Sequence, residues 1–546
     1  MMRVGLALEV GPLSATMMND GGRGYARDER GSRGCQHVSP RAAVRGECVP
    51  EAEPEKHLGF LPRPRRRKLT LLDARAMTPE EALLALKTVA TLRTALFGLL
   101  LYAFIRLTLY VWRPLLDRVF VSTSVKRYVA YDGKQSGTSV VCVDCTHRHL
   151  PTLTHHKDST TPKHLRGDTS TDTVFNALHA GWRPLKVADA VTCNHFDIDG
   201  LISVWALIDP LKALEHEDVL REAARIGDFR ELRVTRGGDD TLDGSSSDDA
   251  NPNRPYGMWS ETAAALKLCA WINSRERSLF TRPFEGVEQD ESVKKFEHFL
   301  PLMNTALDAV EPPEGSSTAT DEVNAAKCGI HDGDEETRRV LEGVERLYRN
   351  VSGLVEWDGP CERWDTLGVC VVRCDEPVHY YALFSLAVDS DVVVGVYNGN
   401  RYEVESRYVG FVDYQSRPSW PRLNLGALAK KLNAMDGAVT RAGSDLRWGV
   451  AGLTDSGPLL RLNDQKRRLT RAERYGHPDE RPIHASELSP DRFVATCRGF
   501  FEHAADGARV HLNAKSNADV PKRDWTWKET HELNSAVDYD AFVNGS

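Results

Sequence analysis

Hydrophobic and polar positions divide the chain into an irregular start, one strongly apolar stretch and a long region of mixed periodicity. Residues 1–68 combine Gly, Arg, Pro and Glu without apolar periodicity. Such a segment cannot bury enough apolar surface to offset its ordering entropy, so we expect disorder there. It ends in a basic cluster at residues 63–68, which suits anionic lipid headgroups. A solvated charge run or a nuclear-import-like patch is the plain alternative.

The most apolar stretch lies between residues 94 and 112 and is apolar on all sides except at Arg106. It follows a helix start at residues 78–81, where Pro and two acids occupy the first turn. A surface helix shows a single apolar stripe, and a membrane span needs about 20 residues. We therefore predict a helical segment over 69–120 with a membrane helix at about 94–112. A buried core helix, an oligomerisation helix and a re-entrant helix are the alternatives.

From about residue 121, short β-branched runs alternate with helical stretches. This alternation predicts an α/β domain over 121–310 with a largely parallel sheet. The candidate strands are 128–131, 139–143 and 190–193. The candidate helices are 171–179, 201–207, 211–225 and 262–273.

A second unit is predicted after an acidic, Ser/Gly-rich stretch. Residues 236–255 and 311–338 have loop composition, and the second of these stretches predicts a linker between domains. A smaller α+β unit then covers 339–500, and residues 501–546 read as a polar tail. The candidate strands of this unit are 369–372, 380–387, 392–396 and 408–412, followed by a helix at 425–432.

Composition narrows the class of protein. A chain of 546 residues with 41 % hydrophobic and 27 % charged residues is globular and long enough for two or three units. Its net charge of −8 gives no footprint for double-stranded nucleic acid. The eleven cysteines are an odd number without framework spacing, which indicates reduced thiols and a folded part that faces the cytosol. No cleaved secretory signal is apparent at the N-terminus.

The sharpest pattern with chemical content is residues 193–203, Cys-Asn-His-Phe-Asp-Ile-Asp-Gly-Leu-Ile-Ser, between an apolar strand and an apolar helix. His195, Asp197 and Asp199 alternate, so in an extended backbone their side chains project to one side. In α/β sheets ligands gather at the carboxyl ends of strands. Carboxylates with an imidazole suit Mn²⁺ or Mg²⁺, which clamp phosphoryl groups and activate water. The pattern predicts a site for one or two divalent cations.

Residues 195–200 resemble the first motif of the DHH phosphoesterase superfamily, Asp/His-x-Asp-x-Asp-Gly after a strand. By that resemblance His195, Asp197 and Asp199 are catalytic manganese ligands. Asp228 then stands for the superfamily's next ligand, an aspartate that ends a later strand. Two further motifs are missing, because no His-His pair follows residue 156 and no Gly-Gly-Gly-His sequence is present.

A broader resemblance, over about residues 128–432, is to an uncharacterised and mostly bacterial family. Its signature Asn-His-Phe-Asp-x-Asp-Gly-Leu corresponds to residues 194–201 here. The resemblance implies that these pieces form one polar site and names no substrate. It makes His147 and Asp168 possible additional ligands or acid–base groups. The other shared pieces are 131–133, 146–147, 165–170 and 227–229.

Simpler interpretations exist for each of these residues. Asp-x-Asp-Gly is common in turns, and Asp168 or Asp228 could cap a helix. The run 142–149 holds two cysteines and two histidines that would suit zinc, although buried free thiols explain it more simply. The sequence contains no Walker loop, nucleophile elbow or dinucleotide fingerprint.

Together these features predict a membrane-anchored, divalent-metal-dependent phosphoesterase-like hydrolase. The expected substrate is a phosphorylated small molecule or a short nucleotide, and the expected metal is Mn²⁺ or Mg²⁺. The alternative is a non-catalytic, membrane-tethered binding or scaffold protein that retains a degenerate metal site. Protein partners are not indicated by the sequence.

Overall fold

The computed structural model describes most of the chain after residue 123. The described ranges are 124–236, 256–280, 288–312, 318–349, 361–457, 459–467, 469–470, 473 and 476–545, with isolated helical residues at 87, 94, 96, 97 and 102. From Leu92 onward the chain forms one compact unit. The predicted disorder of 1–68 and most of the predicted segment 69–120 lie outside the described residues. Within the described ranges, no helix is long and apolar enough to cross a membrane.

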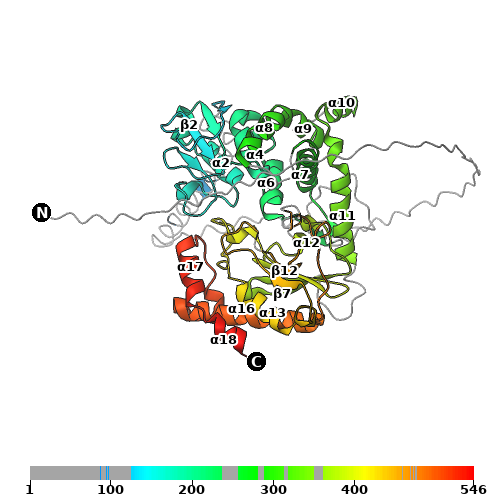
Figure 1. Ribbon diagram of the computed structural model, residues 1–546. Helices are drawn as coiled ribbons and strands as arrows, with labels where there is room; N and C mark the ends of the chain where they lie inside the picture. The colour runs from blue at the N-terminus through cyan, green and yellow to red at the C-terminus, as the bar shows by residue number, and fades with distance from the viewer. Residues whose placement is uncertain are drawn as a thin grey trace, which may run out of the picture. The chain divides into compact units, whose positions relative to one another are not determined.

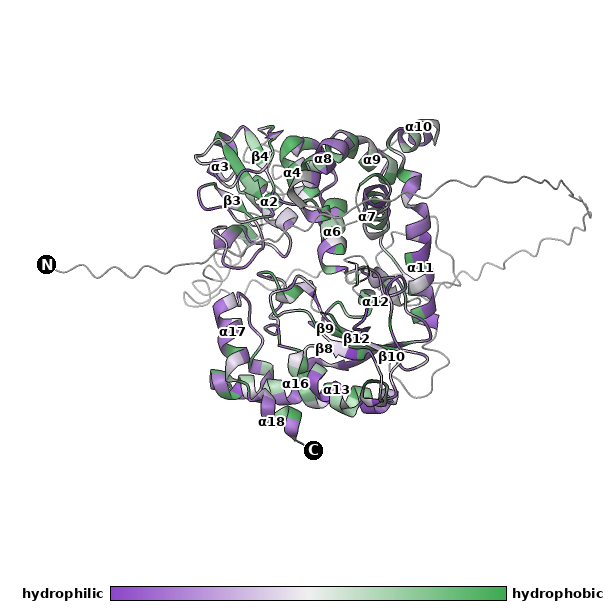
Figure 2. Cartoon of the chain, viewed as in Figure 1, coloured by the Kyte–Doolittle hydropathy of each residue, from purple (hydrophilic) through white to green (hydrophobic). Residues whose placement is uncertain are grey.

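A four-stranded sheet in the N-terminal half (residues 124–349) has the order β1-β4-β2-β3, and all of its pairings are parallel. This result confirms the parallel sheet that the sequence predicts. The strands are short, and β2 and β4 are mainly apolar and buried almost throughout. Figure 2 shows β4 as hydrophobic, as a strand covered on both faces requires. The strands are β1 (Arg127–Tyr128), β2 (Val140–Val143), β3 (Thr152–Leu153) and β4 (Ala190–Thr192).

Helices cover this sheet and extend the core beyond it (Figure 1). The described helices up to residue 229 are α2 (Ser170–His179), α3 (Arg183–Val187), α4 (Ile198–Ile208), α5 (Pro210–Glu215) and α6 (Glu217–Phe229). Those between 260 and 349 are α7 (Ser260–Leu279), α8 (Glu288–Phe299), α9 (Met303–Val310), α10 (Thr318–Cys328) and α11 (Asp334–Arg349). A short antiparallel pair joins β5 (Thr235–Arg236) to β6 (Tyr256–Gly257).

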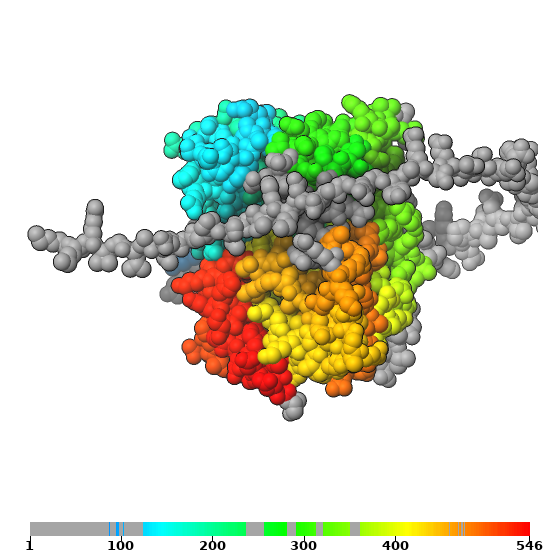
Figure 3. All heavy atoms as spheres, in the orientation of Figure 1, coloured from blue at the N-terminus to red at the C-terminus, as the bar shows by residue number. Residues whose placement is uncertain are grey.

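The C-terminal half (residues 361–545) carries a six-stranded sheet in the order β11-β12-β10-β9-β8-β7. Only the β8–β9 pairing of this sheet is parallel. Its strands are β7 (Cys361–Trp364), β8 (Val369–Cys374), β9 (Val392–Tyr397), β10 (Arg401–Ser406), β11 (Leu446–Gly449) and β12 (Leu459–Asp464). Its helices are α12 (Tyr380–Ser385), α13 (Gly426–Met435), α14 (Gly437–Thr440), α16 (Pro490–Leu512), α17 (Trp527–Ala536) and α18 (Tyr539–Asn544). Figure 3 shows this half in yellow to red.

Strand β8 explains how the two halves share a core. Cys370 and Val372 belong to a cluster that includes the parallel sheet and its helices, whereas Val369 and Val371 pack with the C-terminal helices. Side chains alternate between the two faces of a strand, so one face of the six-stranded sheet packs on the N-terminal half. The residues on this shared face tie the site-bearing half to the C-terminal half.

Two predicted strands of the C-terminal half are wrong. Helix α12 occupies residues 380–385 of the first, because the parallel strands β8 and β9 require a crossover connection. His379 caps this helix, since its Nδ1 accepts a hydrogen bond from the backbone N–H of Tyr381 at 3.2 Å. Residues 408–412 contain a 3₁₀ turn at Tyr408–Gly410 and a single β-bridge from Val412 to His156.

Two stretches of polar composition are also helical. The predicted linker 311–338 contains α10 and the start of α11, and the predicted polar tail 501–546 contains α17, α18 and the end of α16. Helix α11 is mainly hydrophilic in Figure 2, yet Val340, Val344 and Leu347 form a buried stripe along it. The composition of the segment did not indicate this stripe, because its average hydrophobicity is low. The predicted domain boundaries themselves stay a prediction.

Candidate metal centre

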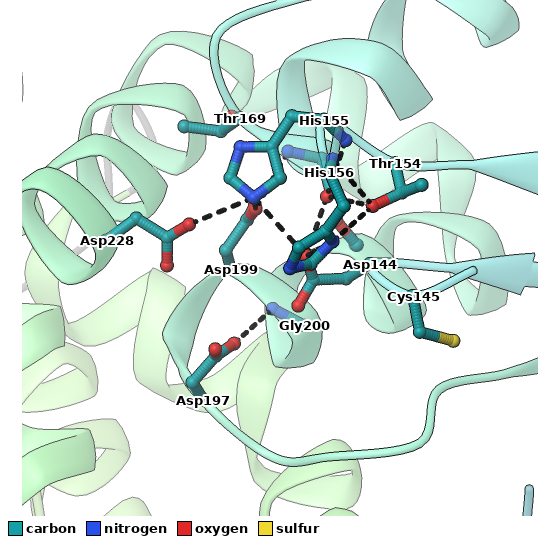
Figure 4. A network of polar contacts seen from close by, with 12 residues as sticks. Asp144, Cys145, Thr154, His155, His156, Thr169, Asp197, Asp199, Gly200 and Asp228 are labelled. Atoms are coloured by element: carbon teal, nitrogen blue, oxygen red, sulfur yellow. Dashed lines mark hydrogen bonds and ion pairs between the residues drawn. The ribbon is translucent and has the colours of Figure 1, made fainter. Parts of the chain in front are cut away.

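Three strand ends bring polar side chains to one edge of the parallel sheet. Asp144 follows β2, His155 lies two residues after β3, and the motif beginning at Cys193 follows β4. Because β3, β2 and β4 are neighbours and parallel, their carboxyl ends meet at that edge. Figure 4 shows Asp144, His155, Asp199 and Asp228 converging there.

The aspartates of the motif are held by helix N-termini. Asp197 caps α4, and its Oδ1 accepts the backbone N–H of Gly200 at 2.7 Å. Asp199 lies in the first turn of α4 and accepts the N–H groups of Ser170 at 2.7 Å and Thr171 at 2.8 Å. These donors belong to the first turn of α2, where unpaired N–H groups and the helix dipole favour a carboxylate. Both aspartates therefore accept hydrogen bonds that fix the positions of their carboxyl groups.

Asp228 reaches the same site from a helix rather than from a strand. It lies in the last turn of α6, and Gly227 beside it packs against Ile198, where a Cβ would approach the Ile198 Cβ to 2.7 Å. The expectation that Asp228 ends a strand is therefore wrong. Its Oδ2 lies 3.3 Å from His155 Nε2, and its role as a metal ligand stays a prediction.

His155 lies at the centre of the site, and the hydrogen bond at its Nδ1 fixes which way the ring points. Its Nδ1 lies 2.6 Å from the backbone oxygen of Asp168, and a carbonyl can only accept, so Nδ1 carries the proton. The buried Nε2 has no hydrogen-bond partner. It faces three carboxylate oxygens, on Asp228 at 3.3 Å, Asp144 at 3.7 Å and Asp199 at 3.8 Å. Either a second proton on Nε2 or a cation between these atoms would balance the negative charge that faces the ring.

A second histidine repeats this arrangement beside Asp144. His195 Nδ1 lies 2.7 Å from the side-chain oxygen of Asn194, and its Nε2 lies 3.0 Å from Asp197 and 3.3 Å from Asp144 Oδ2. Asp144 uses its other oxygen, Oδ1, toward His155. Asp144 therefore lies between two histidines and its carboxylate faces both. We call Asp144, His155, His195, Asp197, Asp199 and Asp228 the carboxylate cluster.

The electrostatics of this cluster favour a bound cation. No described lysine or arginine forms an ion pair with any of its four carboxylates. Burial, together with repulsion from Asp199, Asp197 and Asp144, raises the pKa of Asp228 well above 3.8. Burial and the neighbouring carboxylates raise the pKa of Asp144 in the same way. Divalent cations would remove this repulsion, because they supply the missing positive charge.

Asp197 and His195 behave as a pair. Exclusion of water favours a neutral carboxyl, but the neighbouring His195 holds the pKa of Asp197 to about 2. The same burial opposes the charge on His195, and Asp197 and Asp144 nevertheless raise its pKa well above 6.5. Without a cation, His195 is thus a protonated partner of Asp197. A divalent cation would compete with that proton.

The structure also places the two additional candidates. His147 lies outside the cluster, where its Nδ1 accepts backbone N–H groups of His149 at 3.1 Å and Leu150 at 3.2 Å. Asp168 lies beside the cluster, but its carboxylate oxygens accept Gln415 N–H at 2.7 Å and Ser416 N–H at 2.8 Å. Burial disfavours its charge, yet Ser416 and Arg225 lower the pKa of Asp168. Neither side chain faces the bare nitrogen of His155.

Sequence analysis missed Asp144 and the pair His155-His156. The expected His-His pair was one beyond residue 156, whereas His155-His156 precedes the motif at residues 193–203. Its position directly after strand β3 was the available signal, since strand ends on one sheet edge meet. Asp144 had the same signal, at the end of the predicted strand 139–143.

The thiols near the site give little support to the zinc interpretation. Cys193 donates its S–H to the backbone oxygen of His195 at 3.1 Å, and burial raises its pKa well above 9. Cys193, Asp144 and His195 do come together, but Cys142, Cys145 and His147 form no such group among the described residues. The described cysteines are all free thiols. A cluster dominated by carboxylate oxygens suits hard cations such as Mn²⁺ or Mg²⁺.

A separate group, Glu336, His379 and His477, lies near the packing of α11 on α12, and we call it the Glu336 cluster. Arg277 makes a short ion pair with Glu336 and donates to His477 Nε2 at 3.1 Å. His379 Nδ1 accepts a backbone N–H, so its proton lies on Nε2 and points toward Glu336 at 3.6 Å. A guanidinium thus already occupies the place of a cation in this cluster.

Comparison with known proteins agrees with the grouping of these residues. A family described as a family of unknown function, DUF6687, matches residues 124–511. The chain belongs to the DUF6687 family. No curated protein and no solved structure matches it. The expectation of an uncharacterised family is confirmed, whereas the similarity to DHH phosphoesterases stays a prediction.

The DUF6687 match has a structural consequence. It begins at residue 124, three residues before β1, and continues through the six-stranded sheet to residue 511 in α16. The match therefore includes every residue of the carboxylate cluster and also the C-terminal half as far as residue 511. The unit characteristic of DUF6687 is larger than the parallel-sheet half alone.

Proposed function

We propose that this DUF6687 protein is a divalent-metal-dependent hydrolase that acts on a phosphorylated small molecule or short nucleotide. The observation that carries the proposal is the buried Nε2 of His155, which has no hydrogen-bond partner and faces carboxylates of three different chain segments. A hydrogen-bonded Nδ1 with a free Nε2 is the usual state of a metal-ligating histidine. His155, Asp199 and Asp228 would hold one cation, with Asp144 beside them.

His195, Asp197 and the second oxygen of Asp144 support a second cation position. Asp144 Oδ2 is buried and has no hydrogen-bond partner, although it lies 3.3 Å from His195 Nε2. A carboxylate between two positions allows two cations to lie close together, as in two-metal phosphoryl-transfer sites. Bound cations would supply charge stabilisation for a phosphoryl group and would lower the pKa of a water molecule.

Neighbouring residues fix the orientation of the side chains in this site. The first turn of α2 fixes both oxygens of Asp199, and the Asp168 carbonyl fixes the ring of His155. Gly200 leaves room for the two carboxylates, because a Cβ there would lie 3.1 Å from both Asp144 and Asp197. The Asp-His-His motif of DHH phosphoesterases is absent as a motif, but Asp144 and the pair 155–156 supply the same residue types. This supports the phosphoesterase proposal.

The experiment is metal binding and turnover by the full-length chain. Manganese content and hydrolysis of p-nitrophenyl phosphate and bis(p-nitrophenyl) phosphate are measured for the wild type and for the Asp197→Asn, Asp199→Asn double variant. We expect the variant to lose both bound Mn²⁺ and turnover. The matched control is Asp389→Asn, Asp540→Asn, whose carboxylates are 76 % and 82 % exposed and which should keep both.

Two results would contradict the proposal. Full turnover in the double variant would show that the cluster is not catalytic. Bound Mn²⁺ without turnover on either ester would favour the non-catalytic binding or scaffold protein with a degenerate site.

The membrane anchor at 94–112 is a separate proposal. It is supported by the apolar composition of that stretch and by the exposure of Leu96, Phe97 and Tyr102, at 58 %, 67 % and 62 %. Carbonate extraction of cell membranes tests it, because an inserted helix stays in the pellet. Release of the protein into the supernatant would contradict it and would favour an oligomerisation helix.

A further inference from the structure

The pair His155-His156 is held in place by the C-terminal half of the chain. Residues 407–417, which we call the docking segment, follow β10 and run to the carboxylate cluster. Asp413 N–H donates to the His155 backbone oxygen at 2.8 Å, and Val412 pairs with His156 in an antiparallel β-bridge. The Tyr408 hydroxyl lies 3.3 Å from His156 Nε2. The docking segment thus pairs with the loop after β3, which carries both histidines.

Asp168 connects the docking segment to His155. Its backbone oxygen accepts the Nδ1 proton of His155 at 2.6 Å. Its carboxylate accepts the N–H groups of Gln415 and Ser416 and makes a short hydrogen bond with the Ser416 hydroxyl. Asp168 is only 3 % exposed. Asp168 therefore orients the imidazole ring of His155 and also binds the docking segment of the C-terminal half.

The same residue also reaches the helix that carries Asp228. Arg225 of α6 donates to Asp168 Oδ2 at 3.1 Å, one turn before Asp228. At the other end, Arg407 donates to the Phe229 backbone oxygen at 3.2 Å and makes a short ion pair with Glu231. The end of α6 is therefore held on both sides of Asp228 by groups that belong to, or contact, the docking segment.

We infer that Asp168 is a positioning residue, which couples docking of residues 407–417 to cation binding by His155 and Asp228. This inference rests on the proposed cation site. By linkage, contacts that favour the cation-ready orientation of His155 strengthen cation affinity, and the cation strengthens those contacts equally. The C-terminal half thus contributes to cation binding, although none of its residues belongs to the carboxylate cluster.

The first test is cation affinity, measured by titration calorimetry of the full-length chain with Mn²⁺. Asp168→Asn keeps the backbone oxygen that His155 needs, but it places an amide N–H group against the donors of Arg225 and Ser416. We expect Mn²⁺ affinity to fall by about 10- to 100-fold, the range for residues that orient metal-ligating histidines. Ser416→Ala, which removes one of these donors, should weaken affinity less and in the same direction.

The matched control is Asp524→Asn. Asp524 also accepts a hydrogen bond from Gln415, at 3.2 Å, but it is 46 % exposed and has no contact with Asp168 or His155. Its Mn²⁺ affinity should equal that of the wild type. A loss in Asp524→Asn as large as that in Asp168→Asn would overturn the specific role of Asp168.

The second test uses only the wild type and does not depend on a variant that folds. Hydrogen exchange of the peptide 407–417 is followed by mass spectrometry with and without Mn²⁺. We expect exchange of the Asp413, Gln415 and Ser416 amides to slow when Mn²⁺ is bound. Linkage sets the upper limit at about 100-fold when Mn²⁺ is present at 100 times its Kd.

The outcomes separate this inference from the proposed function. Wild-type Mn²⁺ binding with unchanged exchange at 407–417, and with wild-type affinity in Asp168→Asn, overturns the coupling and leaves the metal site intact. Absence of Mn²⁺ binding in the wild type overturns both.

Discussion

The carboxylate cluster and the Glu336 cluster use the same residue types and have opposite electrostatics. In the first, four carboxylates face two histidine nitrogens, and no lysine or arginine of the described residues pairs with them. In the second, the guanidinium of Arg277 contacts Glu336 and His477, and His379 lies beside Glu336. Proximity of His and Glu or Asp is therefore a weak criterion for a metal site. The proton positions and the surrounding charges distinguish the two.

The hydrogen-bond partners of the two buried histidines make this contrast concrete. The Nδ1 of His155 donates to a carbonyl, which leaves its Nε2 free to bind a cation. The Nδ1 of His379 accepts a backbone N–H, which puts the proton on Nε2 and blocks it as a ligand. Both side chains are 0 % exposed. Burial is equal, so the tautomer and the neighbours decide the chemistry.

The largest expected effect comes from exchanging each of these histidines for asparagine. In His155→Asn the amide can still donate to Asp168, but the nitrogen that faces the carboxylates is gone. We expect Mn²⁺ affinity to fall by at least about 100-fold, since residues that only orient a ligand already cost up to that much. His379→Asn should bind Mn²⁺ as the wild type does. Calorimetry checks both, and equal losses in the two variants would remove the distinction.

The Glu336 cluster should depend on its arginine for stability. In Arg277→Met a buried Glu336 loses its partner, which costs about 3–5 kcal/mol for fully buried pairs. Arg277 is 30 % exposed, so we expect a loss of about 2 kcal/mol in the free energy of unfolding. The control is Arg338→Met on α11, whose pairs with Glu335 and Glu342 are exposed. Urea denaturation measures both, and equal stability would contradict the structural role of Arg277.

His147 offers a way to separate a structural histidine from a ligand. His147→Ala leaves the N–H groups of His149 and Leu150 without their acceptor, which should cost about 1.5 kcal/mol of stability. Mn²⁺ affinity should not change. The control for stability is His331→Ala, because the His331 side chain is 70 % exposed. Loss of Mn²⁺ binding in His147→Ala would restore it as a ligand candidate.

The two clusters should also respond to pH with opposite sign. The raised pKa of Asp228 means that, without a cation, its contribution to stability is present near pH 3.8 and is lost as pH rises. Burial lowers the pKa of His379 from 6.5 to about 3, so stability is lost as pH falls below 6.5. The slope is at most about 1.4 kcal/mol per pH unit for one proton.

Unfolding free energies measured without divalent cations between pH 4 and 8 test this difference. Asp228→Asn should flatten the decline toward high pH, and His379→Asn should flatten the decline toward low pH. Added Mn²⁺ should remove only the first of these declines. Identical pH profiles in the two variants would contradict the assigned environments.

Much of the parallel-sheet half could be predicted from local pattern. Strands β2 and β4, helix α4 and the motif between them follow from short apolar runs and from the capping residue Asp197. Those signals are local, because a strand end, a cap and a helix start occupy adjacent residues. His195, Asp197 and Asp199 were placed for the same reason.

The rest of the site depends on contacts between distant segments. Asp144, His155 and Asp228 meet only because β2 and β3 lie next to β4 and because α6 packs on α4. The docking segment forms a single β-bridge instead of the predicted strand, since its partner is the loop after β3. Residues 380–385 are helical because the parallel strands β8 and β9 need a crossover connection. The pattern of residues along the chain does not predict any of these contacts between distant segments.

The most direct test of the central claim is the position of a bound cation. Crystals of the full-length protein grown with Mn²⁺ would give an anomalous difference map at the manganese edge. We predict a peak at coordination distance from His155 Nε2 and from the carboxylates of Asp199 and Asp228. The absence of a peak there, or a peak at the Glu336 cluster instead, would contradict the account.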